Sequence, residues 1–121
     1  MLKTIHIGDK EYPRSLINIS NPPKRLYAIG NTSLLNSTGI AIVGSRKASD
    51  YGIENCKYFA EKLARCNITI ISGMALVIDS IAHIQAIKFN APTIAVLGTG
   101  FNHIYPAENL KLMNDIILNN G

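Results

Sequence analysis

The fold is decided by residues 39–52, which read Gly-Ile-Ala-Ile-Val-Gly-Ser-Arg-Lys-Ala-Ser-Asp-Tyr-Gly. An apolar, mostly β-branched run from Ile40 to Val43 leads into small residues, and then into Ser49 and Asp50, either of which is a good helix N-cap. The run does not alternate between polar and apolar residues, which is typical of a parallel strand covered on both faces. The stretch therefore predicts a buried strand, a tight loop and the start of a helix.

The same strand-loop-helix order returns twice further along the chain. Two more apolar runs, at 68–71 and 93–97, end in Ser72-Gly73 and in Gly98-Thr99-Gly100. Apolar spacing predicts helices from about Ser49 or Asp50 to Cys66, from Leu76 to Phe89 and from Ala107 to Asn119. Right-handed crossovers join such units into half of a doubly wound sheet. We therefore predict an α/β fold: a Rossmann-like, three-layer α/β/α arrangement with a mainly parallel sheet.

The first 38 residues are different in character. Turn signals at Tyr12-Pro13, Asn21-Pro22-Pro23 and Gly30-Asn31 separate short segments. We expect an N-terminal extension at 1–38 and an incomplete Rossmann-like domain at 39–121. Because a three-stranded parallel sheet leaves exposed edges, we expect the front part of a longer domain, or else an edge that a partner completes; the first is preferred.

Composition restricts the class of protein. The chain has 121 residues, of which 47% are hydrophobic, and no apolar run reaches the length of a membrane span or resembles a secretory signal. We expect a soluble cytoplasmic domain without a membrane-spanning segment. Residues 1–65 hold ten Lys and Arg against five Asp and Glu, whereas residues 66–121 hold two against three. This basic first half suits an anionic partner, and lysines on a solvated helix explain it equally well.

The cysteines and histidines predict neither a disulfide nor a metal site. Cys56 and Cys66 would lie about 15 Å apart on one helix, which is too far for a disulfide. The three histidines follow no metal-ligand spacing.

Three loops are the candidate binding site, because ligands of doubly wound sheets bind beyond the carboxyl ends of the strands. In the first loop, Gly44 allows close backbone approach, Ser45 can donate a hydrogen bond, and Arg46 and Lys47 can bind a phosphate beside a helix N-terminus. Ser72 and Gly73 form the second loop, and Gly98, Thr99 and Gly100 form the third. Standard dinucleotide and P-loop motifs are absent, so ordinary tight turns remain an alternative.

Asp79 and His83 lie four residues apart and therefore share one face of the second helix. They are either an orienting pair beside a ligand or a buried histidine satisfied by a local carboxylate. Ser72 is not expected to act as a nucleophile, because no GxSxG motif surrounds it.

Several of these motifs together closely resemble the DNA-processing protein A (DprA/Smf) family. The resemblance rests on residues 41–46, Tyr51-Gly52, Ser72-Gly73-Met74-Ala75, Ile78-Asp79, Ala82-His83, residues 93–100, Tyr105-Pro106 and Glu108-Asn109. The N-terminal Tyr12-Pro13, Leu16, Pro22-Pro23, Leu26-Tyr27 and Gly30-Asn31 also look like the lead-in of that family.

The resemblance implies a cytoplasmic bacterial protein that binds single-stranded DNA in natural transformation, protects it, helps to load the RecA recombinase and self-associates into a homo-oligomer. It implies no catalytic reaction, and we expect no cofactor. The implied phosphate-binding residues are Gly44, Ser45, Arg46, Lys47, Ser72, Gly73, Gly98, Thr99 and Gly100. Tyr51, Gly52, Asp79 and His83 would have mainly structural roles near the pocket.

The chain departs from the family pattern at Leu76 and Val77, where the family has Arg and Gly. Leu76 removes a cation expected at the DNA pocket, and Val77 stands where close backbone approach or a positive φ is expected. Two other functions stay open. One is a nucleotide-processing enzyme similar to nucleoside-monophosphate phosphoribohydrolases, for which Asp79 and Glu108 are the nearest candidate acids. The other is a divergent scaffold that no longer binds DNA.

Overall fold

The computed structural model describes residues 1–104 and 107–121. Tyr105 and Pro106, which form part of the resemblance above, lie outside the described residues. Within the described part, the order of elements from Gly39 is β3 (Gly39–Ala41), α2 (Asp50–Arg65), β4 (Thr69–Ser72), α3 (Ile78–Lys88), β5 (Thr93–Ala95), the 3-10 turn η2 (Phe101–His103) and α4 (Ala107–Leu118). The predicted alternation of strands and helices is therefore confirmed.

The three strands form a parallel sheet in the order β3-β4-β5. Ile40 lies beside Ile70, and Ile70 beside Thr93, so these three side chains point to the same face. Thr93 contacts His83 of α3 on that face, and Ala95 packs there against a cluster formed by α4 residues. The α/β class and the parallel sheet are thus as predicted.

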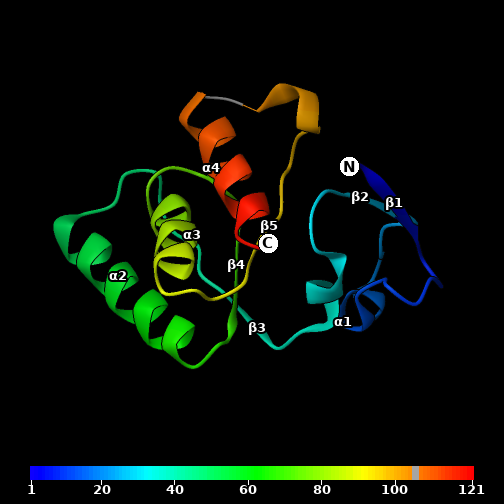
Figure 1. Ribbon diagram of the computed structural model, residues 1–121, viewed down its shortest axis with the longest axis horizontal. Helices are drawn as coiled ribbons and strands as arrows, with labels where there is room; N and C mark the ends of the chain where they lie inside the picture. Colours follow the sequence, from blue (N-terminus) through cyan, green and yellow to red (C-terminus); the bar gives the residue numbers. More distant parts are fainter. Residues whose placement is uncertain (105–106) are drawn as a thin grey trace.

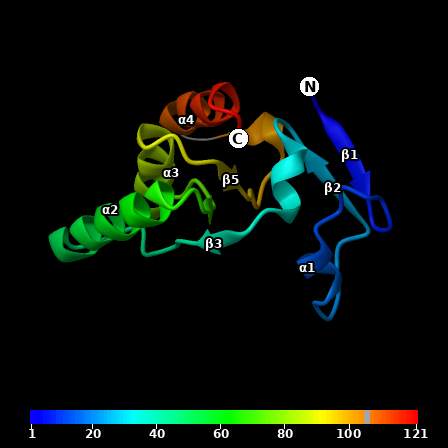
Figure 2. The same cartoon turned by 60° about the horizontal axis from the view of Figure 1, so that its bottom comes forward.

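The helices of the described residues that pack on this sheet lie on one face of it. The helices α2, α3 and α4 cover one face of the sheet, and no helix of residues 1–104 or 107–121 covers the other (Figures 1 and 2). Because the strands follow one another across the sheet in sequence order, right-handed crossovers put successive helices on the same side. The described part of the chain therefore has two layers, and β3 is exposed rather than buried on both faces.

Small residues allow α2 and α3 to pack closely on the sheet. Ala60 of α2 and Ala82 and Ala86 of α3 are fully buried around Ile70 of the central strand. A second cluster joins Met74 to Leu112 and Ile116 of α4. Burying apolar surface at about 25 cal/mol per Å² makes these two clusters the main source of stability. Together they hold the carboxyl ends of the strands in place.

The N-terminal residues form a separate two-stranded sheet. β1 (Lys3–His6) pairs antiparallel with β2 (Arg25–Ala28), and α1 (Arg14–Ile17) and the 3-10 turn η1 (Thr32–Asn36) complete this part. It lies at the opposite end of the molecule from α2 (Figures 1 and 2). Tyr12 is buried, and its hydroxyl donates to the carbonyl of Pro23 at 2.6 Å.

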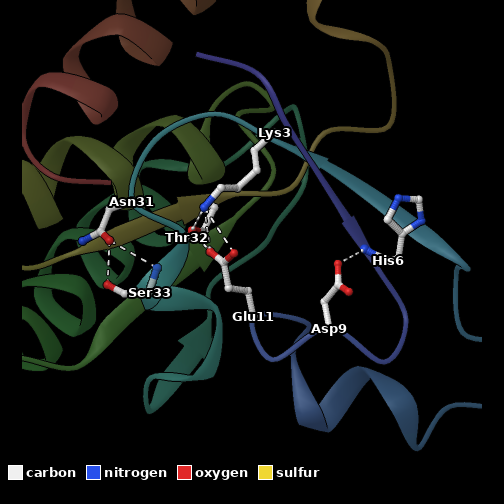
Figure 3. Close-up of polar contacts among 7 residues, drawn as sticks. All are labelled: Lys3, His6, Asp9, Glu11, Asn31, Thr32 and Ser33. Carbon is white, nitrogen blue, oxygen red and sulfur yellow. Dashed lines mark hydrogen bonds and ion pairs between the residues drawn. The ribbon is translucent and has the colours of Figure 1, made fainter.

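Polar contacts tie the strand β1 to the turn η1. Lys3 Nζ lies 2.9 Å from Glu11 Oε2, and the Thr32 hydroxyl donates to the same carboxylate (Figure 3). The hydrogen bond from Thr32, together with Lys3, lowers the pKa of Glu11. Asn31 caps η1 by accepting from the amide of Ser33 at 3.2 Å. These contacts connect the two strands of the extension to the segment that enters β3.

Candidate functional site

The three candidate loops begin side by side at the carboxyl edge of the sheet. Just beyond the paired strands, the amide of Ile42 donates to the carbonyl of Ile71 at 2.9 Å, and the amide of Val96 donates to the carbonyl of Ser72 at 2.8 Å. The chain therefore leaves all three strands at one edge, as the sequence predicts.

Gly44 sits directly against the start of α3. A Cβ atom placed on Gly44 would lie 2.7 Å from Cγ1 and 2.9 Å from Cβ of Ile78. Real carbon atoms do not approach so closely, so only glycine fits here without movement of α3. This contact fixes the start of the first loop.

The rest of the first loop is held by local hydrogen bonds. Ser45 Oγ accepts from the amide of Lys47 at 3.1 Å, and Ser49 caps α2 by accepting from the amide of Gly52 at 3.1 Å. A Cβ on Gly52 would make only ordinary contacts. The loop therefore enters α2 in a defined conformation, with a helix N-terminus that favours anions beside it.

Arg46 and Lys47 both point out of this loop as exposed side chains. Neither forms an ion pair or a side-chain hydrogen bond with any residue in the described ranges. Their charges are therefore available to a ligand. A guanidinium also offers bidentate donors that match a phosphate.

The second loop uses its polar groups internally. The Ser72 hydroxyl is buried and donates to the carbonyl of Ile42 at 2.5 Å, across the β3–β4 pair. The amide of Gly73 donates to Asp79 Oδ2 at 3.0 Å. In this conformation Ser72 and Gly73 shape the edge of the site, and their hydrogen-bond donors are already engaged.

Asp79 and His83 are both buried, with exposed fractions of 5% and 0%. His83 Nδ1 lies 2.8 Å from Thr93 Oγ1, so its hydrogen-bond partner is a threonine and not Asp79, contrary to the interpretation of a buried histidine satisfied by a local carboxylate. Burial lowers the pKa of His83 to about 4, against the opposing effect of Asp79. Burial and the Asp79 carboxylate raise the pKa of the Cys56 thiol nearby. Both Asp79 and His83 lie behind the loops, not on their surface.

The third loop leads away from the first two. Gly98 has open space around it, and Thr99 and Gly100 line a hollow of about 540 Å³ between β2 and β5. The walls of this hollow are mostly apolar, with Leu26 and Tyr27 on one side and Ile94 on the other. The sequence analysis did not find this hollow, because its walls come from segments far apart in the chain and carry no shared motif.

Cys56 is buried, Cys66 is exposed, and both are free. Among the residues that the structure describes, no three His, Cys, Asp or Glu side chains gather as a metal site would require. No helix in the described ranges is both long and apolar enough to cross a membrane.

Comparison with known proteins identifies the family. The sequence profile of DNA recombination-mediator protein A matches residues 3–121. The chain belongs to this family.

Relatives within the DNA recombination-mediator protein A family are similar along nearly the whole chain. The DNA processing protein DprA of Bacillus subtilis is 40% identical over 112 residues, which is 92% of this chain and 38% of the relative. Protein Smf of Borreliella burgdorferi is 38% identical over 98% of this chain and 38% of its own length. The chain thus spans about two fifths of the length of these relatives.

A solved structure from the same family has the same fold. The crystal structure of DNA processing protein A from Streptococcus pneumoniae superimposes with a TM-score of 0.88 at 36% identity, covering 95% of this chain and 40% of that one. DNA processing protein A from Helicobacter pylori, whose structure was described for its single-stranded DNA binding mode, gives a TM-score of 0.82 at 30% identity over 97% of this chain and 52% of that one.

Leu76 and Val77, which depart from the family pattern, lie at the entrance to α3. Leu76 is 49% exposed, so an apolar side chain stands on the surface at the position where the family resemblance led us to expect a cation. Val77 has φ −110°, a region open to any residue, and the positive φ of this loop is at Met74, with φ 58°. The backbone of this chain therefore has no need of glycine at position 77.

Proposed function

We propose that this chain binds single-stranded DNA through the first loop, with Arg46 and Lys47 holding phosphates. The supporting observation is that both side chains are exposed and unpaired within the described residues, on a loop fixed by Gly44 against Ile78. Unpaired cations on an already ordered loop are well suited to bind phosphates. Because the loop is ordered before binding, little conformational entropy is lost when the ligand binds. The Helicobacter pylori relative binds single-stranded DNA, which agrees with this assignment.

The other predicted residues have supporting roles in the proposal. Gly44, Ser45, Ser72 and Gly73 shape the site, whereas Gly98, Thr99 and Gly100 extend it toward the hollow beside β5. Tyr51 and Gly52 lie in the first turn of α2. Asp79 and His83 are hydrogen-bonded to Gly73 of the second loop and to Thr93 of β5, and so hold these segments in place.

The proposal does not include a catalytic step. Asp79, the acid closest to the strand tips in sequence, is buried and accepts a hydrogen bond from Gly73, so it is poorly placed to meet a substrate. Incubation with nucleoside monophosphates followed by chromatography tests this part; release of free base would contradict it. In the cell, we propose a cytoplasmic homo-oligomer that protects incoming DNA and assists RecA loading, as the family's role as recombination mediator suggests.

Fluorescence anisotropy with labelled oligothymidylate tests the proposed site. Arg46→Ala is expected to weaken binding about tenfold or more, because a hydrogen bond to a charged group is lost. It should also reduce the slope of log affinity against log salt by about 0.7. Arg14→Ala, which removes the same charge from an exposed position on α1, is the matched control. Equal losses for the two variants would show that net charge, and not this loop, determines binding.

Leu76→Arg tests whether the departure from the family pattern weakens the site. Because Leu76 is half exposed, the arginine can be accommodated, and affinity is expected to rise with a steeper salt dependence. No gain at all would favour the scaffold alternative.

A further inference from the structure

The outer face of α2 carries an unusual line of aromatic and basic side chains. Tyr51, Tyr58, Lys62 and Arg65 are spaced by seven, four and three residues, which places them on one side of the helix. This side is opposite to the buried Cys56, Ala60 and Ala64. Tyr51 and Tyr58 are 80% and 57% exposed. Figures 1 and 2 show α2 at the outer end of the helical layer, where this side faces away from the sheet.

Cations accompany the aromatic rings at the far end of the line. Lys62 Nζ lies 5.4 Å from the centre of the Tyr58 ring, and the Tyr58 ring meets Phe59 edge-on with centroids 5.4 Å apart. At the end of the helix, Arg65 lies 4.8 Å and Lys88 lies 5.6 Å from the ring centre of Phe89. Rings with adjacent cations suit an anionic ligand that also has aromatic faces.

The charges on α2 leave some of these cations free. Glu54 is paired with Lys57 at 3.9 Å, and Glu61 with Arg65 at 3.3 Å. Neither Lys62 nor Lys88 has an acidic partner within residues 1–104 and 107–121. Lys62 on this face of α2, and Lys88 at the end of α3 where Arg65 meets Phe89, therefore carry charges that no acid neutralises within the described residues.

The line is continuous with the loop proposed above. Tyr51 follows Lys47 by four residues and stands in the first turn of α2. From Tyr51 to Arg65 the helix rises about 21 Å. We propose that single-stranded DNA held at the Arg46 loop continues along this face, with bases stacking on Tyr51 and Tyr58 and phosphates meeting Lys62 and Lys88. This inference rests on the proposed function and adds a second contact to it.

We call this line of side chains, from Tyr51 to Arg65 with Lys88, the track. Any base can stack on an aromatic ring, and the lysines bind phosphates that every nucleotide carries, so the track would bind DNA without sequence preference. It would also make affinity depend on strand length. At ~3.4 Å per nucleotide of a stacked strand, a dinucleotide is expected to occupy the loop alone, whereas an oligonucleotide of about 20 nucleotides, longer than usual site sizes of ~4–16, would also reach Tyr58.

Anisotropy titrations with the two oligothymidylates test the track. Tyr58→Leu keeps an apolar, helix-compatible side chain and removes the ring. It is expected to weaken binding of the 20-mer about five- to tenfold and to leave binding of the dinucleotide unchanged. Lys62→Gln provides a second variant with a smaller loss on the 20-mer and a lower salt slope. The matched control is Tyr58→Phe, which keeps the aromatic ring and is expected to bind the 20-mer as the parent does. Circular dichroism verifies that each variant is folded.

The outcomes separate this inference from the proposed function. If Arg46→Ala weakens both oligonucleotides while Tyr58→Leu and Lys62→Gln bind the 20-mer as the parent does, the track is refuted and the loop site stands. If the parent binds neither oligonucleotide, the proposed function fails and the track with it. Since the chain has no tryptophan, quenching of tyrosine emission by the 20-mer that is reduced in Tyr58→Leu would support stacking directly.

Discussion

Nδ1 of His83 lies 2.8 Å from the hydroxyl oxygen of Thr93, in the interior between α3 and the sheet. The Thr93 hydroxyl donates its one hydrogen to the carbonyl of Ile70 at 2.7 Å, so it must accept from His83. The proton of the neutral imidazole is therefore on Nδ1. Nε2 is a buried acceptor without a partner among the described residues, and so is Asp79 Oδ1.

Acid is expected to destabilise the fold through His83. Its pKa falls from 6.5 in the unfolded chain to about 4 in the folded one, so the unfolded chain binds an extra proton between these values. The free energy of unfolding is therefore unaffected by titration of His83 above pH 6.5. It decreases as the pH falls from 6.5 toward 4, by up to about 3 kcal/mol. Urea unfolding at a series of pH values measures this loss.

The control separates His83 from the carboxylates that titrate in the same range. His83→Asn keeps an N–H near the position of Nδ1 and cannot titrate, so the difference in unfolding free energy between parent and variant should shrink as the pH falls. His6→Asn makes the same substitution at an exposed imidazole and serves as the control for the change of side chain. Parallel curves for the parent and His83→Asn would contradict the assignment.

Gly44→Ala is expected to lower the free energy of unfolding by about 1–3 kcal/mol, because the new methyl group meets Ile78. Gly98→Ala, where a Cβ has open space, should change stability by less than about 0.5 kcal/mol. Urea denaturation measures both. Adding Ile78→Ala to Gly44→Ala should cost less than the sum of the two single changes, and strict additivity would show that the two residues do not meet.

Removing the cap of α2 should destabilise the helix. Ser49→Ala loses the acceptor for the amide of Gly52 and is expected to cost about 1 kcal/mol in chemical denaturation. Ser49→Asp keeps an acceptor and should remain close to the parent. A loss as large in Ser49→Asp as in Ser49→Ala would mean that the cap does not stabilise α2.

The N-terminal extension depends on the hydroxyl of Tyr12. Tyr12→Phe removes the 2.6 Å hydrogen bond to Pro23 and should cost about 1 kcal/mol, measured by urea unfolding. Tyr27→Phe alters an exposed ring and is the control. Equal stability of the Tyr12 variant and the parent would show that Tyr12 anchors the extension by packing alone.

The sequence predicts the helices well wherever local signals agree. α2 begins after Ser49 and ends at Arg65, because a capping serine and an amphipathic pattern determine both ends. α3 begins at Ile78, two residues later than expected, because the backbone turns at Met74 before the helix starts. The sequence does not predict this turn, because methionine seldom adopts a positive φ and no glycine or asparagine stands at position 74.

Features that depend on distant residues escape sequence reasoning. The pairing of β1 with β2 and the position of Thr99 beside β2 arise from segments more than 15 residues apart. The position of α2 and α3 on the same face of the sheet follows from the strand order β3-β4-β5, which periodicity does not report. For the site, the sequence predicts that the three loops start at one edge of the sheet. It does not show that the Ser72 hydroxyl and the Gly73 amide donate hydrogen bonds to groups inside the fold.

The closing turn after α4 meets the N-terminal extension. The amide of Asn31 donates to the carbonyl of Gly121 at 3.0 Å, and its side chain reaches the carbonyl of Asn120, 89 residues further along the chain. Bringing together such distant residues costs chain entropy that local helices do not incur. We therefore expect the junction at Asn31 to form later than α2 and the contacts around Ile70, and to open more readily than they do in the native state.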